Sequence, residues 1–201
     1  MAVKPTSETF TIREGASIVV DFQGGQTGGG VETVSIPTNL DTLNREVLQI
    51  QEVDFDLQGM SFWAGVMARN NGSVDPAAVY INGDLYVILT EVDPAIDPNV
   101  LSLDSPHFIA GKHLSMIAGL VIQSDDNPDT ASFSSVAAQE APLFTTAAKE
   151  LFLTVSYGFN GNDNTTPGLN NATIRGVMRT MANRGRADAD TYASILTGLF
   201  S

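Results

Sequence analysis

Residues 45–57, REVLQIQEVDFDL, contain the clearest structural pattern in the chain. Apolar and polar residues alternate along them, as in a β-strand with one buried and one solvent-exposed face. The apolar residues occupy even positions as far as Ile50 and odd positions from Val53 to Leu57. One extra residue in a strand produces such a change of phase, so the pattern predicts a β-bulge at Gln51–Glu52 with both halves facing one core. Two short strands separated by a kink are the alternative.

Similar patterns predict further strands on both sides of this stretch. The expected strands are Phe10–Ile12 and Ile18–Phe22 in a hairpin that turns at Glu14–Gly15, then Val31–Ile36, Ser61–Ala68, Leu85–Leu89, Phe108–Ile122, part of Phe133–Thr146, and Leu151–Phe159. A helix is the alternative for Phe108–Ile122. Leu85–Leu89 is apolar on both faces, so it should be central in its sheet. The residues between these segments are rich in Gly, Asn, Asp and Pro, which predicts turns and irregular loops.

The last thirty residues have a different pattern. Apolar residues recur twice at i, i+3, i+4 and i+7, the spacing of an amphipathic helix. The two sets are Ile174, Val177, Met178 and Met181, then Tyr192, Ile195, Leu196 and Leu199. Gly185 suits the residue after the first helix, and Asp188 or Asp190 can cap the second. We therefore predict a β-sandwich over residues 1–170, preceded by a short flexible arm at residues 1–7, and an amphipathic helical hairpin as a C-terminal extension over residues 171–201.

Composition and charge exclude several classes of protein. The chain has 201 residues, which suits one all-β domain, and no cysteine, which excludes disulfides and thiolate ligands. It is acidic, with a net charge of −13, but residues 171–201 hold four Arg against two Asp. An acidic body repels nucleic acid at long range, so no direct nucleic-acid binding is expected. No apolar targeting segment follows Met1, and Leu114–Ile122 is far shorter than the ~20 residues of a membrane helix. We expect synthesis and folding in the cytosol.

The sequence contains no recognisable catalytic or phosphate-binding motif. Gly24–Gly30 is rich in glycine, but it lacks the Lys-Ser/Thr pair and the following helix of a P-loop, which favours a flexible connection. No GxSxG nucleophile elbow is present. A glycosidase pair could in principle draw on Glu52, Asp54, Asp56 or Glu91, but carboxylates on a strand more simply keep one face soluble. We predict that the chain is not an enzyme.

Metal sites are not predicted either. His107 and His113 are six residues apart, about 20 Å along one strand at ~3.3 Å per residue, so they cannot share a metal without a sharp turn. Three loops carry clustered Asp and Asn oxygens: Asp93 and Asp97; Asp125, Asp126, Asn127 and Asp129; and Asn160, Asn162, Asp163 and Asn164. None has the EF-hand spacing that closes on Glu, so we expect hydrogen bonds within turns. No cofactor is expected, with structural calcium as the alternative.

The chain as a whole resembles a jelly-roll β-sandwich, with about eight strands, long polar loops and no catalytic motif. Its polar arm, bulged early strand, strong last strand LFLTVSYGF at residues 151–159 and C-terminal extension resemble a single jelly-roll viral capsid subunit. The resemblance is architectural, covers most of the chain and includes no signature motif. The chain lacks the basic N-terminal arm with which many capsid proteins package nucleic acid. This departure points to a shell with an internal membrane, a separate packaging protein, or a decorating subunit.

The resemblance implies a structural virion protein that self-assembles as a homo-oligomer into an icosahedral shell. Its partners would be copies of itself and other virion proteins, it would be made in the host cytoplasm, and contact with an internal membrane stays open. We predict assembly contacts at Arg175, Arg179, Arg184, Arg186 and Tyr192, with the basic end meeting the acidic body of a neighbour. The alternative is that the arginines only solvate a helix face. The alternative function is a carbohydrate-binding or adhesion module, including a phage tail or fibre component, with Trp63 and Tyr80 as the residues to test.

Overall fold

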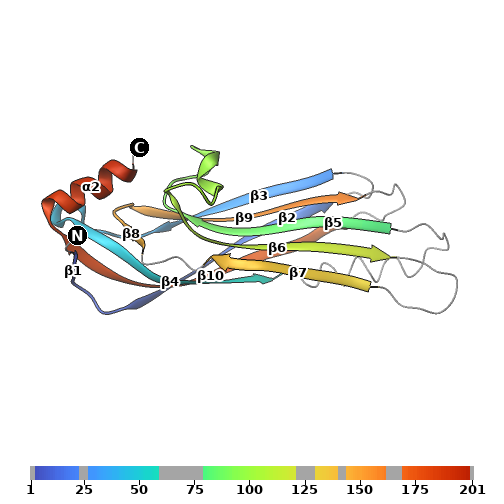
Figure 1. The fold of residues 1–201 in the computed structure, drawn as a ribbon, viewed down its shortest axis with the longest axis horizontal. Helices are drawn as coiled ribbons and strands as arrows, with labels where there is room; N and C mark the ends of the chain where they lie inside the picture. The colour runs from blue at the N-terminus through green and yellow to red at the C-terminus, as the bar shows by residue number, and fades with distance from the viewer. Residues whose placement is uncertain are drawn as a thin grey trace.

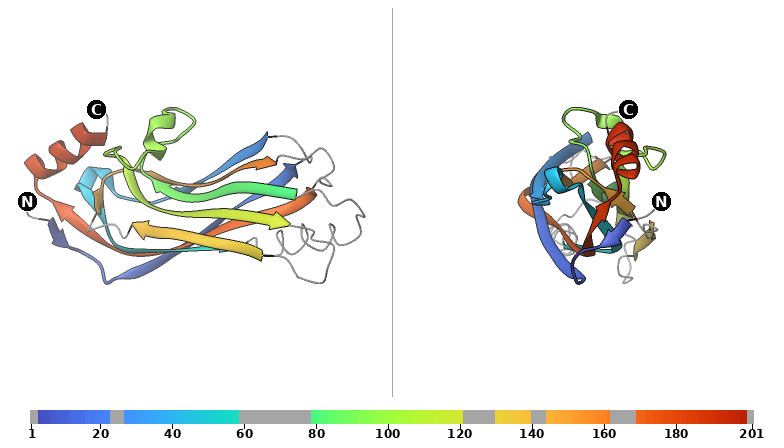
Figure 2. Two further views of the ribbon diagram at one scale, coloured as in Figure 1. Left: turned by 45° about the vertical axis from the view of Figure 1, so that its right-hand side comes forward. Right: turned by 90° about the vertical axis from the view of Figure 1, so that its left-hand side faces the viewer.

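The computed structural model describes residues 3–22, 27–58, 79–120, 130–139, 144–161 and 169–199. These residues form ten β-strands, two short 3-10 helices and one α-helix, α2 (Ala189–Leu199). Two five-stranded antiparallel sheets face each other along the length of the molecule (Figure 1). Both chain ends lie at one end of the sandwich, which we call the terminal end (Figure 1 and Figure 2).

We name each sheet after one of its long interior strands. The β10 sheet contains β1 (Val3–Pro5) and β2 (Phe10–Phe22) beside β10 (Leu169–Ala187), followed by β4 (Glu46–Gln58) and β8 (Phe144–Thr146). The β9 sheet contains, in order, β3 (Thr27–Pro37), β9 (Glu150–Gly161), β5 (Val79–Thr90), β6 (Phe108–Leu120) and β7 (Thr130–Gln139). The 3-10 helices η1 (Thr42–Asn44) and η2 (Pro98–Leu101) lie in connections.

The strand pairs are nested. β2 pairs with β10, β3 with β9, β4 with β8, and β5 with β6, all antiparallel. The chain thus runs outward along four strands and returns along four others in reverse order, which is the topology of a jelly roll. β1 extends the β10 sheet beside the end of β10, and β7 adds a fifth strand to the β9 sheet. The predicted all-β jelly-roll-like antiparallel sandwich is confirmed.

β4 contains the predicted bulge. Met181 of β10 lies opposite Glu52, whereas the next residue, Ala182, lies opposite Ile50, so Gln51 is the extra residue. The apolar residues before and after the bulge are buried in one core: Leu48, Ile50, Val53 and Phe55. The kink between two separate strands is therefore not what the structure shows.

The space between the sheets is closed around the middle of β10. A Cβ atom added to Gly176 would lie 2.5 Å from Cγ2 of Val155 on β9 and 3.0 Å from Cγ2 of Val87 on β5. Protein interiors are packed as densely as organic crystals, so no side chain fits at this position without displacing its neighbours. At this point the backbone of β10 packs directly against side chains of the β9 sheet, which leaves no room for a ligand at Gly176.

The first of the two predicted C-terminal helices is wrong, because residues 174–181 belong to strand β10. Ile174, Gly176, Met178, Thr180 and Ala182 are all buried, so every second residue faces the core. The predicted boundary between residues 170 and 171 falls inside this strand, which pairs with β2 on one side and β4 on the other.

Three further predictions near the N-terminus are wrong. β2 runs from Phe10 to Phe22 without the turn predicted at Glu14–Gly15, and its even-numbered residues from Phe10 to Ile18 all lie on the inner, less exposed face. Gly15 instead makes room for the guanidinium of Arg175, whose Nε would lie 3.2 Å from an added Cβ. The predicted flexible arm includes β1, which pairs with the end of β10. The glycines at positions 28–30, predicted to be part of a flexible connection, lie in β3.

The second C-terminal helix is confirmed as α2. The Asp188 carboxylate accepts a hydrogen bond from the Thr191 N–H at 2.8 Å, and the hydrogen bonds from Thr191 hold the pKa of Asp188 below its ordinary value. α2 packs on a small apolar cluster at the terminal end, separate from the main core: Val47, Ala147, Ala187 and Tyr192, with Val3, Ile195 and Leu196 at its edge. Gly185, predicted to follow a helix, is buried in β10 beneath Val3.

Most other strand predictions are confirmed. Val31–Ile36, Leu85–Leu89, Phe108–Ile122 and Leu151–Phe159 correspond to β3, β5, β6 and β9, and β5 is central in its sheet as predicted. The strand predicted at Ser61–Ala68 lies outside the described residues.

Candidate assembly surfaces

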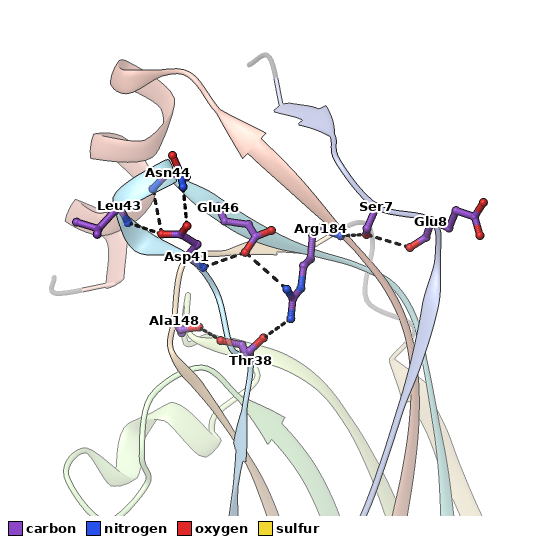
Figure 3. Close-up of polar contacts among 9 residues, drawn as sticks. All are labelled: Ser7, Glu8, Thr38, Asp41, Leu43, Asn44, Glu46, Ala148 and Arg184. Carbon is purple, nitrogen blue, oxygen red and sulfur yellow. Dashed lines mark hydrogen bonds and ion pairs between the residues drawn. The ribbon is translucent and has the colours of Figure 1, made fainter.

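Arg184, close to the end of β10, joins three segments of the terminal end (Figure 3). Its guanidinium donates to the Thr38 carbonyl oxygen at 3.3 Å and lies 3.8 Å from the Glu46 carboxylate. It also lies over the Phe10 ring, 5.9 Å from the centroid, and its backbone N–H donates to Ser7 Oγ at 2.8 Å. Arg184 is half-buried among these contacts.

The connection from β3 to β4 is held by hydrogen bonds at both ends. Thr38 Oγ1 donates to the Ala148 carbonyl at 2.7 Å, and the Thr38 N–H donates to the Lys149 carbonyl at 2.9 Å. Asp41 begins η1, and its carboxylate accepts from the side-chain amide of Asn44 at 2.6 Å (Figure 3). The hydrogen bonds from Asn44 hold the pKa of Asp41 below its ordinary value. These hydrogen bonds hold the connections at the terminal end in fixed positions.

The outer face of the β10 sheet carries charges that are sorted by strand. Arg13 of β2 lies directly opposite Arg179 of β10, and Asp54 of β4 lies opposite Arg179 on the other side. Arg175 occupies the same face of β10 four residues earlier. The outward residues of β4 are carboxylates at Glu52, Asp54 and Asp56. All these side chains are exposed, so this face offers arginines on two strands and carboxylates on the third.

The remaining predicted contact residues lie at the terminal end. Arg186 is exposed and lies opposite Lys4 of β1. Tyr192 is only 9% exposed and packs in the cluster beneath α2, so it anchors the helix. Arg184 and Tyr192 hold elements of one chain together. A role in assembly for Arg175, Arg179, Arg184, Arg186 and Tyr192 stays a prediction.

A pocket of about 730 Å³ lies between α2 and the connection from β5 to β6. Its walls include Ile96, Leu196 and Leu199, and its lining also includes Glu91 and His107. His107 Nδ1 lies 3.1 Å from Glu91 Oε1, and the two side chains are 10% and 8% exposed. The Glu91 N–H also donates to the His107 carbonyl at 3.1 Å. The pair therefore closes the base of the β5–β6 connection.

The outer face of the β9 sheet carries an aromatic stack beside two glycines. The rings of Tyr86 and His113 have centroids 4.2 Å apart and planes 3° from parallel. His113 Nε2 lies 2.8 Å from Asp84 Oδ1. Burial, with a smaller contribution from the charge of Asp84, raises the pKa of Tyr86. Gly158 lies opposite both Asp84 and Gly29, and a Cβ added to Gly158 would meet nothing within 4 Å.

Sequence reasoning missed the carboxylate partners of both histidines. Glu91 and Asp84 are 16 and 29 residues from the histidines that they contact. The contact between His113 and Asp84 follows from the pairing of β5 with β6. This pairing sets Tyr86 opposite His113 and Asp84 two residues away on the same face. The two histidines contact different carboxylates, His107 with Glu91 and His113 with Asp84.

The clustered loop oxygens in the described part of the chain accept hydrogen bonds within turns. Asp93 accepts a hydrogen bond from the Ala95 N–H and Asp97 from the Asn99 N–H, which confirms the prediction for this cluster. The other two clusters lie outside the residues whose side chains are described. Within the described ranges, no three His, Asp or Glu side chains are grouped so that they could hold a metal ion. Over the same ranges, no helix has the length and apolar character to span a membrane.

The nested strand pairs place the chain in the class of jelly-roll β-sandwiches. No protein-family model and no curated protein matches its sequence. Solved structures of polyomavirus VP1, a jelly-roll capsid protein, are similar to it in backbone arrangement at low sequence identity.

Three VP1 structures illustrate this similarity. VP1 of Trichodysplasia spinulosa-associated polyomavirus is 8% identical, with a TM-score of 0.44, covering 92% of this chain and 99% of that one. An unassembled VP1 pentamer of Washington University polyomavirus is 11% identical, with a TM-score of 0.40 and coverage of 93% and 97%. The unassembled VP1 pentamer of Merkel cell polyomavirus is 10% identical, with a TM-score of 0.36 and coverage of 93% and 99%. These likenesses concern the fold alone.

Proposed function

We propose that this chain is a structural subunit of a viral capsid that assembles with other copies of itself into an icosahedral shell. Jelly rolls occur in viral capsids, lectins and cupins, so the fold alone does not choose among them. The observation that carries the proposal is a closed interior combined with a charge-sorted exterior. Val87 and Val155 pack directly on Gly176, so in the described part of the chain partners are expected at the outer faces and the terminal end rather than between the sheets at this point.

In this proposal the β-sandwich is a rigid building block, and the protein functions by assembling with other copies. The terminal end, held by the contacts of Thr38 and Arg184, gives the building block a fixed edge. Arg175, Arg179 and Arg186 contact acidic surfaces of neighbouring copies, and closed symmetry repeats these modest contacts many times. The acidic body disfavours direct contact with nucleic acid. The subunit performs no catalysis, is made in the host cytoplasm, and is located in the virion with other virion proteins.

The size of the purified full-length protein tests this proposal. Light scattering and negative-stain electron microscopy, over a range of protein concentration, salt and pH, should reveal discrete oligomers or closed particles. Mass spectrometry of purified particles should then detect the chain as an abundant component. A strict monomer under all these conditions would overturn the proposal.

A specific observation favours carbohydrate binding as a second candidate function. Glycine in a strand interior destabilises the strand by about 0.5–1 kcal/mol relative to alanine, and it often marks a place where a ligand approaches the sheet. Within the described residues, no neighbouring atom requires glycine at position 158. The open space above Gly158 lies beside Asp84 and near Tyr86 of β5. A combination of aromatic and polar side chains of this kind is typical of ligand sites.

A glycan array distinguishes this candidate from assembly. Gly158→Leu places a side chain in the space above position 158. Glycan binding by the native chain that is lost in this variant would support carbohydrate binding, and an array without hits would rule it out. Trp63, the other proposed test residue, lies outside the described residues, and Tyr80 lies on β5, which also carries Tyr86.

A further inference from the structure

We propose that two copies of this chain associate through the outer faces of their β10 sheets, with β4 of each copy lying over β2 of the other. The contact rests on the capsid function proposed above, and it specifies the partner surface and the symmetry of one interface. Its occupant is a second copy of the same chain.

The outward side chains of three adjacent strands form a regular grid. Row by row from β2 through β10 to β4, they are Thr11, Met181 and Glu52; Arg13, Arg179 and Asp54; Gly15, Val177 and Asp56; then Ser17 and Arg175. The charged members are three arginines and three carboxylates, so the grid is neutral in a chain of net charge −13. Two acidic copies can therefore approach each other here without the repulsion that the rest of their surfaces produces.

Two arginines of the grid, Arg13 and Arg179, face each other without an ion pair to any carboxylate in the described part of the chain. Arg13 and Arg179 lie directly opposite each other on antiparallel strands, where like charges are destabilising. Asp54 lies opposite Arg179 on the other side, yet within the part of the chain that the structure describes no ion pair within 4.0 Å is found for Arg13, Arg179 or Asp54. A carboxylate supplied by a second copy would relieve this arrangement.

A two-fold symmetric contact can bring the carboxylates of one copy opposite the arginines of the other. A two-fold axis that runs parallel to the strands above β10 exchanges the positions of β2 and β4 while each row keeps its level. Asp54 of each copy then faces Arg13 of the other, and the same contact occurs twice because the interface is isologous. An axis perpendicular to the strands would instead place β4 on β4, carboxylate against carboxylate. Charge therefore selects the first arrangement.

The size of the grid indicates a weak contact. From residue 173 to residue 181, β10 spans about 27 Å at ~3.4 Å per residue, and the three strands lie ~4.8 Å apart. With its side chains the face covers on the order of 400 Å², about half of what each partner contributes to a standard interface. The half-buried Val177 and Met181 provide an apolar centre. The contact should therefore depend on protein concentration and weaken with salt, as suits one interface among several in a shell.

Charge-swap complementation tests this contact on the full-length protein. Arg13→Asp sets carboxylates against Asp54 at both copies of the contact, and Asp54→Arg sets arginines against Arg13. Each variant alone should associate at least about tenfold more weakly than the native protein in sedimentation at low salt. An equimolar mixture restores opposite charges at both contacts, so its association should return to within about threefold of native. Lys149→Asp, at an exposed site away from the grid, changes the net charge by the same amount as Arg13→Asp and should have no effect.

The outcomes separate this contact from the capsid function. If the native protein associates and both single variants associate equally well, the contact is wrong and the capsid function stands. If the mixture stays as weak as the single variants, the two-fold pairing is wrong. If the native protein is monomeric at every concentration and salt, both are wrong. Circular dichroism of each variant confirms folding, which exposed substitutions should preserve.

Discussion

Deleting Gln51 should leave the fold nearly intact, although this residue lies in the middle of a long interior strand. Gln51 is the extra residue of the bulge, so without it Ile50 and Glu52 become neighbours and keep their partners Ala182 and Met181. The apolar residues on the two sides of the deletion then follow one unbroken alternation. The losses are a long side-chain hydrogen bond to Asn183, at 3.5 Å, and the local bend, together about 1 kcal/mol.

Deleting Asp54, three residues further along, cannot be absorbed in the same way. If the first half of β4 keeps its register, Phe55 turns to solvent and Asp56 turns into the core. If the bulge is lost instead, Val53 turns outward and Glu52 turns inward. Either result removes at least one buried apolar side chain, about 1.5–3 kcal/mol, and buries a carboxylate at a further cost of several kcal/mol. The sum is comparable with the whole stability of a domain, about 5–15 kcal/mol.

Urea denaturation followed by circular dichroism, at one protein concentration, measures the difference between the two deletions. The Gln51 deletion should lower the free energy of unfolding by about 1 kcal/mol, whereas the Asp54 deletion should lower it by at least ~4 kcal/mol or prevent folding. Gln51→Ala separates the loss of the side chain from the loss of the backbone residue. Equal destabilisation by the two deletions would refute the bulge and the register derived from it.

Three further predictions concern the core, the terminal end and α2. Gly176→Val should lower the free energy of unfolding by about 1–3 kcal/mol or more, because its Cβ would lie 2.5 Å from a methyl group of the opposite sheet, whereas Gly158→Val, with nothing within 4 Å, should be neutral or stabilising. Equal shifts in their melting temperatures would contradict the closed interior. Thr38→Val removes the donor to a buried carbonyl and should cost about 1 kcal/mol in the urea titration, so an unchanged midpoint would contradict this role. Hydrogen bonds from Thr191 lower the pKa of Asp188 below 3.8, so the stabilisation of α2 is present above pH 3.8 and is lost as pH falls through the lower folded pKa. Asp188→Asn keeps an acceptor without a charge, and its helical circular-dichroism signal should depend less on acid than that of the native chain, which an identical acid titration would disprove.

β4 and β10 show which features of the fold can be predicted from the sequence. In β4, strict alternation with one change of phase leaves only one register that buries Ile50 and Val53 together, so the bulge is predictable. In β10, the buried set includes Gly176 and Thr180, which do not count as apolar in a hydrophobicity pattern. The remaining buried residues, Ile174, Met178 and Ala182, are four apart, a spacing that a helix and a strand share. Close approach of the two sheets is what selects small residues here, and a single sequence does not display it.

The candidate assembly residues divide in the same way. The exposed positions of Arg175 and Arg179 follow from either secondary structure, because residues four apart share one face of a helix and of a strand. Arg13 is different, because its place opposite Arg179 depends on the pairing of β2 with β10. Pairs of this kind join residues more than a hundred positions apart, as Thr33 and Thr154 do across β3 and β9. Local patterns carry no information about such partners.

The nesting of the strands determines when each surface forms during folding. β2 is among the first strands to be synthesised, yet its partner β10 is the last, so the β10 sheet is completed only by contacts of very long sequence separation. Such contacts make folding slow, because a long loop must close before they stabilise the chain. A nascent chain that lacks β10 therefore has no arginine and carboxylate grid on its surface. The proposed association between copies would therefore be delayed until synthesis has passed this last strand.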